Sequence, residues 1–222
     1  DYCGGDKHSL LKEIREYATV FRKAINAEII DDELPAEAGI ERLNAVIFAI
    51  DTATLIPYIL FVERNIQEAS VRNDLYDYLE SYIMRRLVTR TTTKNYNQLF
   101  ADRLIYNRIL TRQAFIDYIS GQDDKTNRMP TNDEVKAAFD ESWLTNKYAA
   151  GVLYLLESRI RDRRRHSTQL LGINKYSLEH MMPKKWRNHW VFSGDKGAAD
   201  LRDRKLLTLG NLTIITQALN AS

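Results

Sequence analysis

A glutamate-histidine pair and two asparagines near the end of the chain have side chains that could hydrolyse a phosphodiester bond. Glu179 and His180 are adjacent, Asn211 follows later, and Asn220 lies nine residues beyond Asn211. A neutral imidazole can take a proton from water near pH 7, since an unperturbed histidine has a pKa of about 6.5. Mg²⁺ prefers oxygen ligands and usually takes one or two from protein. We therefore expect His180 to act as general base, and Glu179 and Asn220 to hold a Mg²⁺ or Mn²⁺ ion that stabilises charge on the phosphate.

These residues can converge if two antiparallel strands are followed by a helix. Residues 176–183 form a short apolar segment that ends at Pro183, and residues 206–216 are rich in strand-forming side chains. Both patterns are typical of strands. Thr216 can cap a helix that begins at Gln217. That helix has six residues before the sequence ends, which is marginal for a helix alone, so we expect the native polypeptide to continue.

The preceding two-thirds of the chain has the apolar spacing of amphipathic helices. Pro57 is expected to start or kink a helix, and Thr131 and Asn132 are expected to cap one. The predicted helices cover residues 10–25, 36–50, 57–61, 75–87, 96–109, 111–119, 133–143 and 147–165. The predicted fold class is therefore α+β. A mostly α-helical domain over residues 1–166 precedes a small strand–strand–helix finger over residues 167–222, which is incomplete at its C-terminal helix.

Composition limits the classes of protein to which the chain can belong. It has 222 residues, one cysteine (Cys3) and a formal net charge of +2. A single cysteine excludes an intrachain disulfide and a cysteine-based zinc site, and it favours a reducing, cytoplasmic setting. The first residues lack the apolar core of a signal peptide. The longest apolar stretch, residues 45–62, contains Asp51 and Pro57, so we expect a buried helix and no membrane contact.

Positive charge is concentrated around the Glu-His pair. Residues 155–205 carry 13 basic and 6 acidic side chains, a net charge of +7, whereas residues 1–60 have a net charge of −5. A polyanion would meet the basic stretch. Two groups of side chains are candidates for contacts with DNA. They are a helix end with Arg163, Arg164 and Arg165, and a spacer between the strands with Lys184, Lys185, Arg187, Arg202, Arg204 and Lys205. The helix end can also be a solvated terminus that complements the helix dipole.

Three motifs of the C-terminal segment together resemble the ββα-metal (HNH) nuclease finger. They are Tyr-Ser-Leu-Glu-His-Met-Met-Pro at 176–183, Leu-Gly-Asn-Leu-Thr-Ile-Ile-Thr at 209–216 and Leu-Asn at 219–220. The chain is most similar to the C-terminal domain of GmrSD-type modification-dependent (type IV) restriction endonucleases. Residues 79–82 and 97–100 resemble the helical part of that domain more weakly.

The resemblance implies a metal-dependent endonuclease that cleaves double-stranded DNA within a restriction system against phage, with modified DNA as its target. It implies that Glu179 and Asn220 bind Mg²⁺ or Mn²⁺, that His180 is the general base and that Asn211 orients it. It also implies a partner, which is an N-terminal nucleotide-dependent domain or subunit of the same system. The chain departs from the pattern in two places. Glu179 stands where many HNH fingers have Asp, and Asn211 follows His180 by 31 residues.

Other interpretations of the same residues remain open. A histidine in an apolar strand is often structural, Asn211 can be a turn residue and Asn220 can be a polar helix residue. The chain would then be a DNA-binding or subunit-docking module with a degenerate finger that binds no Mg²⁺. A ribonuclease or toxin would share the chemistry and differ in its substrate.

Overall fold

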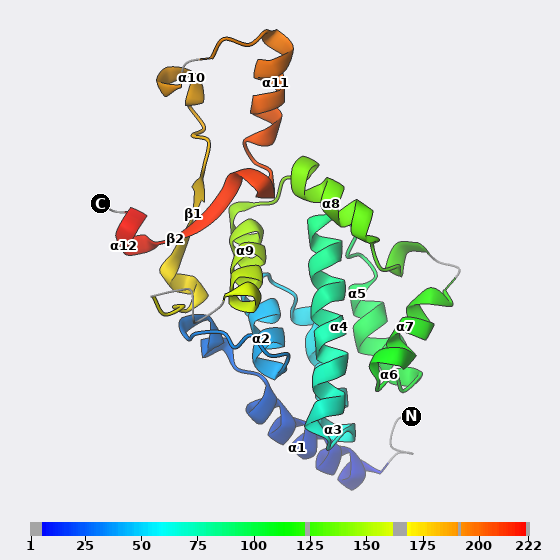
Figure 1. The fold of residues 1–222 in the computed structure, drawn as a ribbon. Coiled ribbons are helices and arrows are strands. Elements are labelled where there is room, and N and C mark those ends of the chain that lie inside the picture. The colour runs from blue at the N-terminus through cyan, green and yellow to red at the C-terminus, as the bar shows by residue number, and fades with distance from the viewer. Residues whose placement is uncertain (1–5, 123–124, 162–167, 191, 221–222) are drawn as a thin grey trace.

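A helical body carries a two-stranded hairpin with a helical insertion (Figure 1). The computed structural model describes residues 6–122, 125–161, 168–190 and 192–220. The main elements of the body are α1 (Lys7–Ala24), α2 (Ile40–Ala49), α3 (Ile56–Asn65), α4 (Ala69–Val88), α5 (Tyr96–Gln98), α6 (Leu104–Tyr106), α7 (Arg112–Ser120), α8 (Asn132–Glu141) and α9 (Asn146–Ile160). The remaining elements are β1 (Tyr176–His180), α10 (Trp186–His189), α11 (Lys196–Lys205), β2 (Leu212–Thr216) and α12 (Gln217–Asn220).

The helix ends follow local chemistry that the sequence shows. Thr131 caps α8 in a capping box with Glu134, and Pro57 lies in the first turn of α3. The helix expected to run to Arg165 is shorter than predicted. It ends at Ile160, because Arg161 has an extended backbone with ψ 113°. Arg163, Arg164 and Arg165 lie outside the described residues.

A buried ion pair joins three helices of the body. The Arg42 guanidinium on α2 donates to both carboxylate oxygens of Glu80 on α4, at 2.8 and 2.6 Å. It also donates to the Leu155 carbonyl and the Ser158 hydroxyl of α9, at 3.0 and 2.9 Å. Arg42 is fully buried and Glu80 is 6% exposed. Arg159 reaches Glu80 from the solvent side at 2.8 Å, so the carboxylate is shared between two cations.

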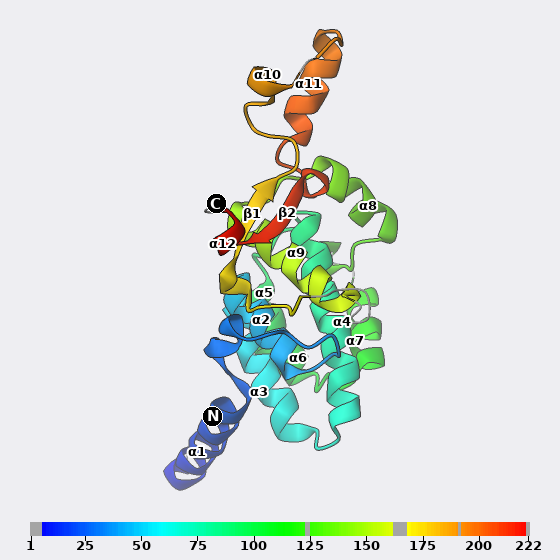
Figure 2. The same ribbon diagram turned by 60° about the vertical axis from the view of Figure 1, so that its left-hand side comes forward.

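The hairpin packs on α9 and has no core of its own. Strands β1 and β2 are antiparallel, with Glu179 opposite Thr213 and His180 opposite Leu212. The main hydrophobic core fills the helical body. A second hydrophobic cluster lies beneath the hairpin and contains side chains from the turn before β2, from β2 itself, from α8, from α9 and from the end of α4. Its buried members are Val88, Ala138, Leu144, Ala149, Val152, Leu209 and Leu212, and Leu178 packs against them. Figure 2 shows the hairpin lying across α9.

The predicted division of the chain at residues 166 and 167 falls outside the described residues. What the described part shows is a shared core between the hairpin and helices α8 and α9. A backbone bridge also pairs Trp143, which follows α8, with Thr208 before β2.

The segment between the strands forms a small protruding unit (Figures 1 and 2). Its centre is Trp186, which is 1% exposed and packs edge-on against Phe192 with 5.2 Å between ring centroids. The Trp186 indole N–H donates to Asp203 on α11 at 3.0 Å. These contacts join α10 to α11, so the long gap between His180 and Asn211 contains a folded element.

The α+β class is confirmed in its coarse form, as a mostly helical chain with one small antiparallel sheet. The order strand, strand, helix is present in β1, β2 and α12, while a metal-binding finger stays a prediction. Among the described segments, no helix has the length and apolar character needed to span a bilayer.

We predict that Glu80→Ala destabilises the protein by about 3–5 kcal/mol, because it leaves the Arg42 charge buried without a carboxylate. Chemical denaturation followed by circular dichroism measures the change. Asp77→Ala is the matched control. Its side chain is 36% exposed and pairs with Arg159 at 2.8 Å, so its loss should cost less than about 1 kcal/mol. Equal effects of the two substitutions would contradict the role given to the buried pair.

Candidate active site

His180 is the last residue of β1 and lies on the body-facing side of the hairpin. Side chains alternate along a strand, so His180 shares a face with Leu178, which packs on the second cluster. Its Nε2 atom is buried and has no hydrogen-bond partner among the described residues. Burial, and after it the ammonium group of Lys184, hold the pKa of His180 below the ordinary histidine value, while the Glu179 carboxylate acts in the opposite direction. Burial and Lys184 therefore favour the neutral imidazole, which is the form that can accept a proton.

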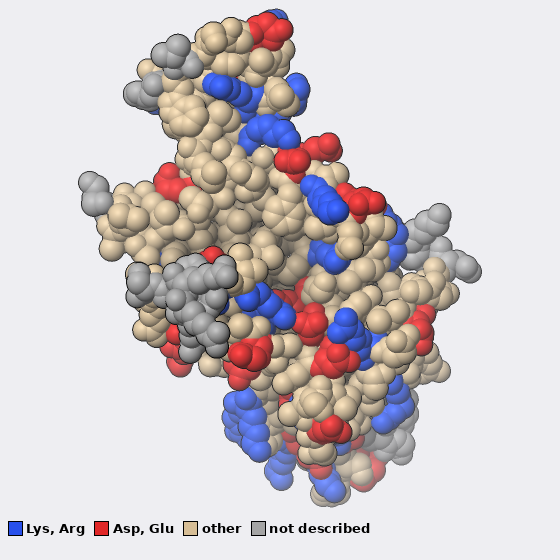
Figure 3. All heavy atoms as spheres, in the orientation of Figure 1, with Lys and Arg blue, Asp and Glu red and all other residues tan. Residues whose placement is uncertain are grey.

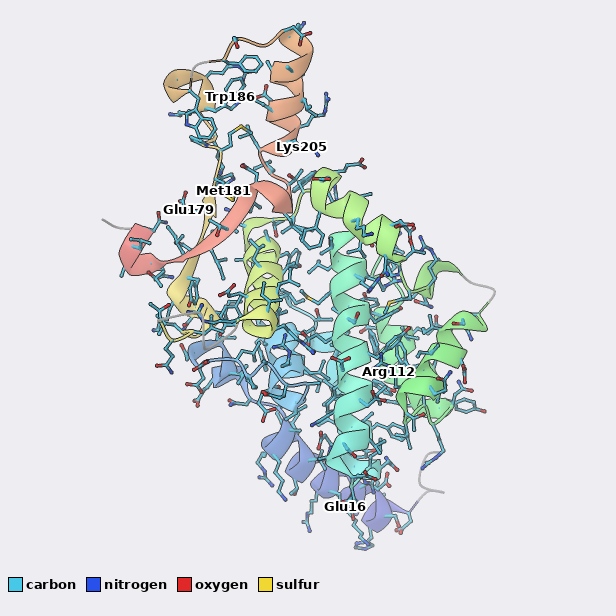
Figure 4. All side chains as sticks on the ribbon, in the orientation of Figure 1. Glu16, Arg112, Glu179, Met181, Trp186 and Lys205 are labelled. Atoms are coloured by element: carbon cyan, nitrogen blue, oxygen red, sulfur yellow. The ribbon has the colours of Figure 1, made fainter. Side chains whose placement is uncertain are left out.

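Glu179 and Asn220 lie on the other face of the hairpin. Alternation places Glu179 on the same face as Ser177, and the Asn220 amide on α12 donates to the Ser177 hydroxyl at 3.0 Å. Helix α12 thus lies against β1, the strand that carries Glu179 (Figure 4). The Asn220 amide oxygen accepts no hydrogen bond from the described residues. A carboxylate and an amide oxygen on one exposed face are ligand types that suit a hard divalent cation.

A site of this kind would offer a cation few protein ligands. Within the described part of the chain, no three His, Cys, Asp or Glu side chains lie close enough to hold a metal ion. Glu179 with Asn220 supplies two oxygen groups, which is the number that Mg²⁺ often takes from protein while water and phosphate complete its shell. These donors therefore fit Mg²⁺ or Mn²⁺ better than a metal that needs a closed protein cage.

Asn211 fastens the loop that follows His180. Its side-chain oxygen accepts from the Met182 N–H at 2.7 Å, and its amide donates to the carbonyls of Met182 and Leu206, at 3.2 and 2.9 Å. Its own carbonyl accepts from the Met181 N–H at 2.9 Å. The role implied by the resemblance was to orient His180. In the structure the side chain holds the main chain two residues beyond His180, so any influence on the imidazole passes through the loop.

Three of the six basic residues of the insertion are engaged within the protein. Arg187 pairs with Asp203 at 2.7 Å, and Arg202 lies over the rings of Phe192 and Trp186. Lys205 donates to the Asp140 carbonyl on α8 at 2.9 Å. These contacts stabilise the insertion and attach it to the body, so Arg187, Arg202 and Lys205 have structural partners besides any contact with DNA.

The other three basic residues of the insertion are free to meet a ligand. Lys184, Lys185 and Arg204 are exposed and form no hydrogen bond or ion pair with the described residues. Figure 3 shows Lys and Arg side chains over the insertion and over the neighbouring edge of the body. Near the end of α9, Arg159 pairs with Asp77 and Glu80, and Arg161 pairs with Glu157. The helix-end arginines that we singled out, Arg163 to Arg165, are not among the described residues.

Two site contacts were missed by sequence reasoning. Ser177 binds Asn220, and its position two residues before Glu179 was a usable signal, since such residues share a strand face. Asp203 accepts from both Trp186 and Arg187. The sequence contains no pattern that predicts the Asp203 contacts, because they depend on how α10 and α11 pack against each other.

Comparison with known protein families finds a similarity in the C-terminal part of the chain. Residues 129–222 match the family model described as GmrSD restriction endonucleases, C-terminal domain. Comparison with curated proteins and with solved structures gives no match. The matched segment begins just before α8 and includes α9, the hairpin, its insertion and α12. All four residues of the candidate site therefore lie inside the segment that is similar to the C-terminal domain of GmrSD restriction endonucleases.

Proposed function

We propose that this chain is the nuclease part of a restriction enzyme and cleaves double-stranded DNA by HNH-type chemistry. The observation that carries the proposal is the hairpin, whose strand β1 ends in Glu179 and His180 on opposite faces and is contacted by Asn220 of α12, within a segment that is similar to a restriction endonuclease domain. Modified phage DNA as the target, and a nucleotide-dependent partner domain or subunit of the same system, belong to the proposal as well.

In this proposal each polar group of the site has one task. The neutral His180 imidazole takes a proton from the attacking water. The Glu179 carboxylate and the Asn220 amide oxygen hold the cation. A bound Mg²⁺ or Mn²⁺ ion would supply Lewis-acid stabilisation of the charge on the phosphate and on the leaving oxygen. Asn211 keeps the loop after His180 closed through Met182. The expected products carry 5′-phosphate and 3′-hydroxyl ends.

Exposed cations beside the hairpin support DNA as the substrate. Lys184, Lys185 and Arg204 carry uncompensated charge on the insertion, and Lys184 is close enough to lower the pKa of His180. Contacts of this kind bind phosphates without reading sequence, so we assign to the insertion the positioning of the duplex over the hairpin.

One observation favours a second candidate function. The His180 Nε2 atom is covered by the protein, which suits a structural histidine. The chain would then be a DNA-binding or subunit-docking module with a degenerate finger. The two candidates differ in metal binding and in cleavage, so the first two experiments below separate them.

The first prediction concerns the general base. His180→Ala should lower metal-dependent nicking of plasmid DNA by about 10²–10⁴-fold, the usual contribution of such a group, without loss of folding by circular dichroism. His8→Ala, which removes an exposed histidine from α1, should cleave like the wild type. Wild-type cleavage by His180→Ala would show that the assignment is wrong.

The second prediction concerns the cation. Calorimetry with Mn²⁺, in the presence of a non-cleavable DNA duplex, should detect binding that Glu179→Gln and Asn220→Ala weaken at least about tenfold, since each removes one of two protein ligands. Glu141→Gln removes an exposed carboxylate from the end of α8 and should bind Mn²⁺ normally. Absence of Mn²⁺ binding by the wild type, with and without DNA, would favour the non-catalytic module.

The third prediction concerns the phosphate contacts. In a plot of the logarithm of the DNA-binding constant against the logarithm of the salt concentration, the negative slope should become shallower by about 0.9 for each phosphate contact removed. Lys184→Ala, Lys185→Ala and Arg204→Ala are expected to show this loss. Lys12→Ala, at the opposite end of the molecule on α1 (Figure 1), should leave the slope unchanged. An unchanged slope in all three insertion variants would place the duplex elsewhere.

A further inference from the structure

A cavity of about 380 Å³ lies beside the hairpin, and the proposed cleavage chemistry does not use it. It lies between the turn after α2, the end of α4 and the start of α9, with Asp51, Arg90, Trp143 and Tyr148 among its lining residues. Small-molecule sites usually measure about 300–1,000 Å³. The cavity is thus large enough for one nucleoside and small for a dinucleotide cofactor.

The lip of the cavity has the side chains that stack on nucleobases. The Arg90 guanidinium lies 4.7 Å from the centre of the Trp143 ring, and Trp143 is 49% exposed. No carboxylate among the described residues pairs with Arg90. An exposed indole beside an unpaired guanidinium offers a base both a stacking surface and a cation for its neighbouring phosphate.

Two side chains at the lip are held there by unfavourable backbone conformations. Asp51 and Arg90 both have φ 55°, and each follows a helix as the residue that closes a Schellman motif. The hydrogen bonds of those motifs run from Thr52 N–H to the Ile47 carbonyl and from Thr91 N–H to the Arg86 carbonyl. Glycine is the usual residue at such positions because it has no Cβ penalty. Arg108 has the same conformation, with φ 50°, and does not line this cavity, so the conformation sets the position of Asp51 and Arg90 and is not by itself a sign of a site.

The charge around the cavity is positive. The Asp51 carboxylate forms an ion pair with the Lys147 ammonium group at 2.6 Å. The negative charge of Asp51 is therefore neutralised by Lys147, and the positive charge of Arg90 is not neutralised by any carboxylate of the described residues. The fully buried Arg86 also lines the cavity. Its guanidinium donates to the carbonyls of Thr92 and Thr126 and to the Tyr96 hydroxyl, and to no carboxylate among the described residues. A cavity of this charge attracts a nucleotide that is still joined to its phosphates.

Main-chain contacts link the lip to the candidate active site. Trp143 pairs with Thr208 in a backbone bridge, and the Thr208 carbonyl accepts from the Asn211 N–H at 3.0 Å. Leu144 lines the cavity and also belongs to the second cluster, with Leu212 of β2. The lip of the cavity is thus connected to the turn before β2, the strand that follows Asn211.

We propose that the cavity receives a nucleobase turned out of the bound DNA duplex, which stacks on Trp143 while Arg90 pairs with a flanking phosphate. The inference rests on the proposed function, since it takes DNA as the ligand. Turning a base out of a duplex costs unpairing and unstacking energy, and the cost is smallest for a mismatched base. A protein that captures the base should therefore prefer mismatched to fully paired DNA.

The test compares two duplexes that differ at one base pair, bound to the 222-residue chain carrying His180→Ala so that no cleavage occurs. The mismatched duplex should bind at least about tenfold tighter than the paired one. Trp143→Ala and Arg90→Gly should reduce that preference to less than about twofold, whereas Trp143→Phe retains a ring and should keep part of it. Tyr106→Ala is the matched control, since it removes an exposed aromatic ring (84% exposed) from α6 that is not among the residues lining the cavity.

Thermal denaturation separates binding from folding. Arg90→Gly should not lower the Tm, because glycine suits φ 55°, while it should still lose the preference for the mismatch. An unchanged preference in Trp143→Ala and Arg90→Gly, or no preference in the parent protein although it binds DNA, would overturn the cavity proposal and leave the proposed nuclease function intact. Absence of DNA binding would overturn both. A mismatch preference in a chain whose wild type cannot nick DNA would overturn the nuclease alone.

Discussion

A two-stranded hairpin is marginally stable in water on its own, and the candidate site depends on how this one is supported. Leu178 and Leu212 pack on the second cluster, so the strands gain their stability from α8 and α9. Helix α9 is in turn held to α2 and α4 by the buried Arg42 guanidinium, which binds Glu80 and the Leu155 carbonyl. The position of His180 therefore depends on an ion pair from the other end of the sequence. Removal of either charge of the Arg42–Glu80 pair would therefore weaken the support that α9 gives to the hairpin.

Alternation along β1 divides the chemistry between two faces. His180 shares a face with Leu178 and is partly buried, which depresses its pKa, whereas Glu179 faces the same side as Ser177 and Asn220. Adjacent residues thus obtain different environments, one that keeps an imidazole neutral and one open to a hydrated cation.

The sequence predicted the elements of this structure better than it predicted their contacts. Apolar periodicity located the long helices, and of the two predicted caps Thr131 caps α8 while Asn132 is its first residue. The first strand was predicted from a short apolar segment that ends at Pro183 and the second from its strand-forming residues, although Leu209–Asn211 forms a 3₁₀ turn and β2 begins only at Leu212. The partners of Arg187, Arg202 and Lys205 could not be predicted, because a basic residue has the same local pattern in an ion pair and on a DNA-facing surface. The insertion between the strands was likewise beyond prediction, since Trp186, Phe192 and Asp203 meet through tertiary packing.

The hydrogen bonds of Asn211 also separate two parts of the molecule mechanically. Because its side chain and carbonyl bind Met182 and Met181, the chain is closed where the insertion leaves the hairpin, and α10 and α11 extend beyond that closure with their own aromatic centre. An element attached in this way can lengthen, shorten or be replaced during evolution without shifting the register of β1 and β2. The insertion, to which we assign the positioning of DNA, can therefore change in length while the strand ends that carry Glu179 and His180 stay as they are.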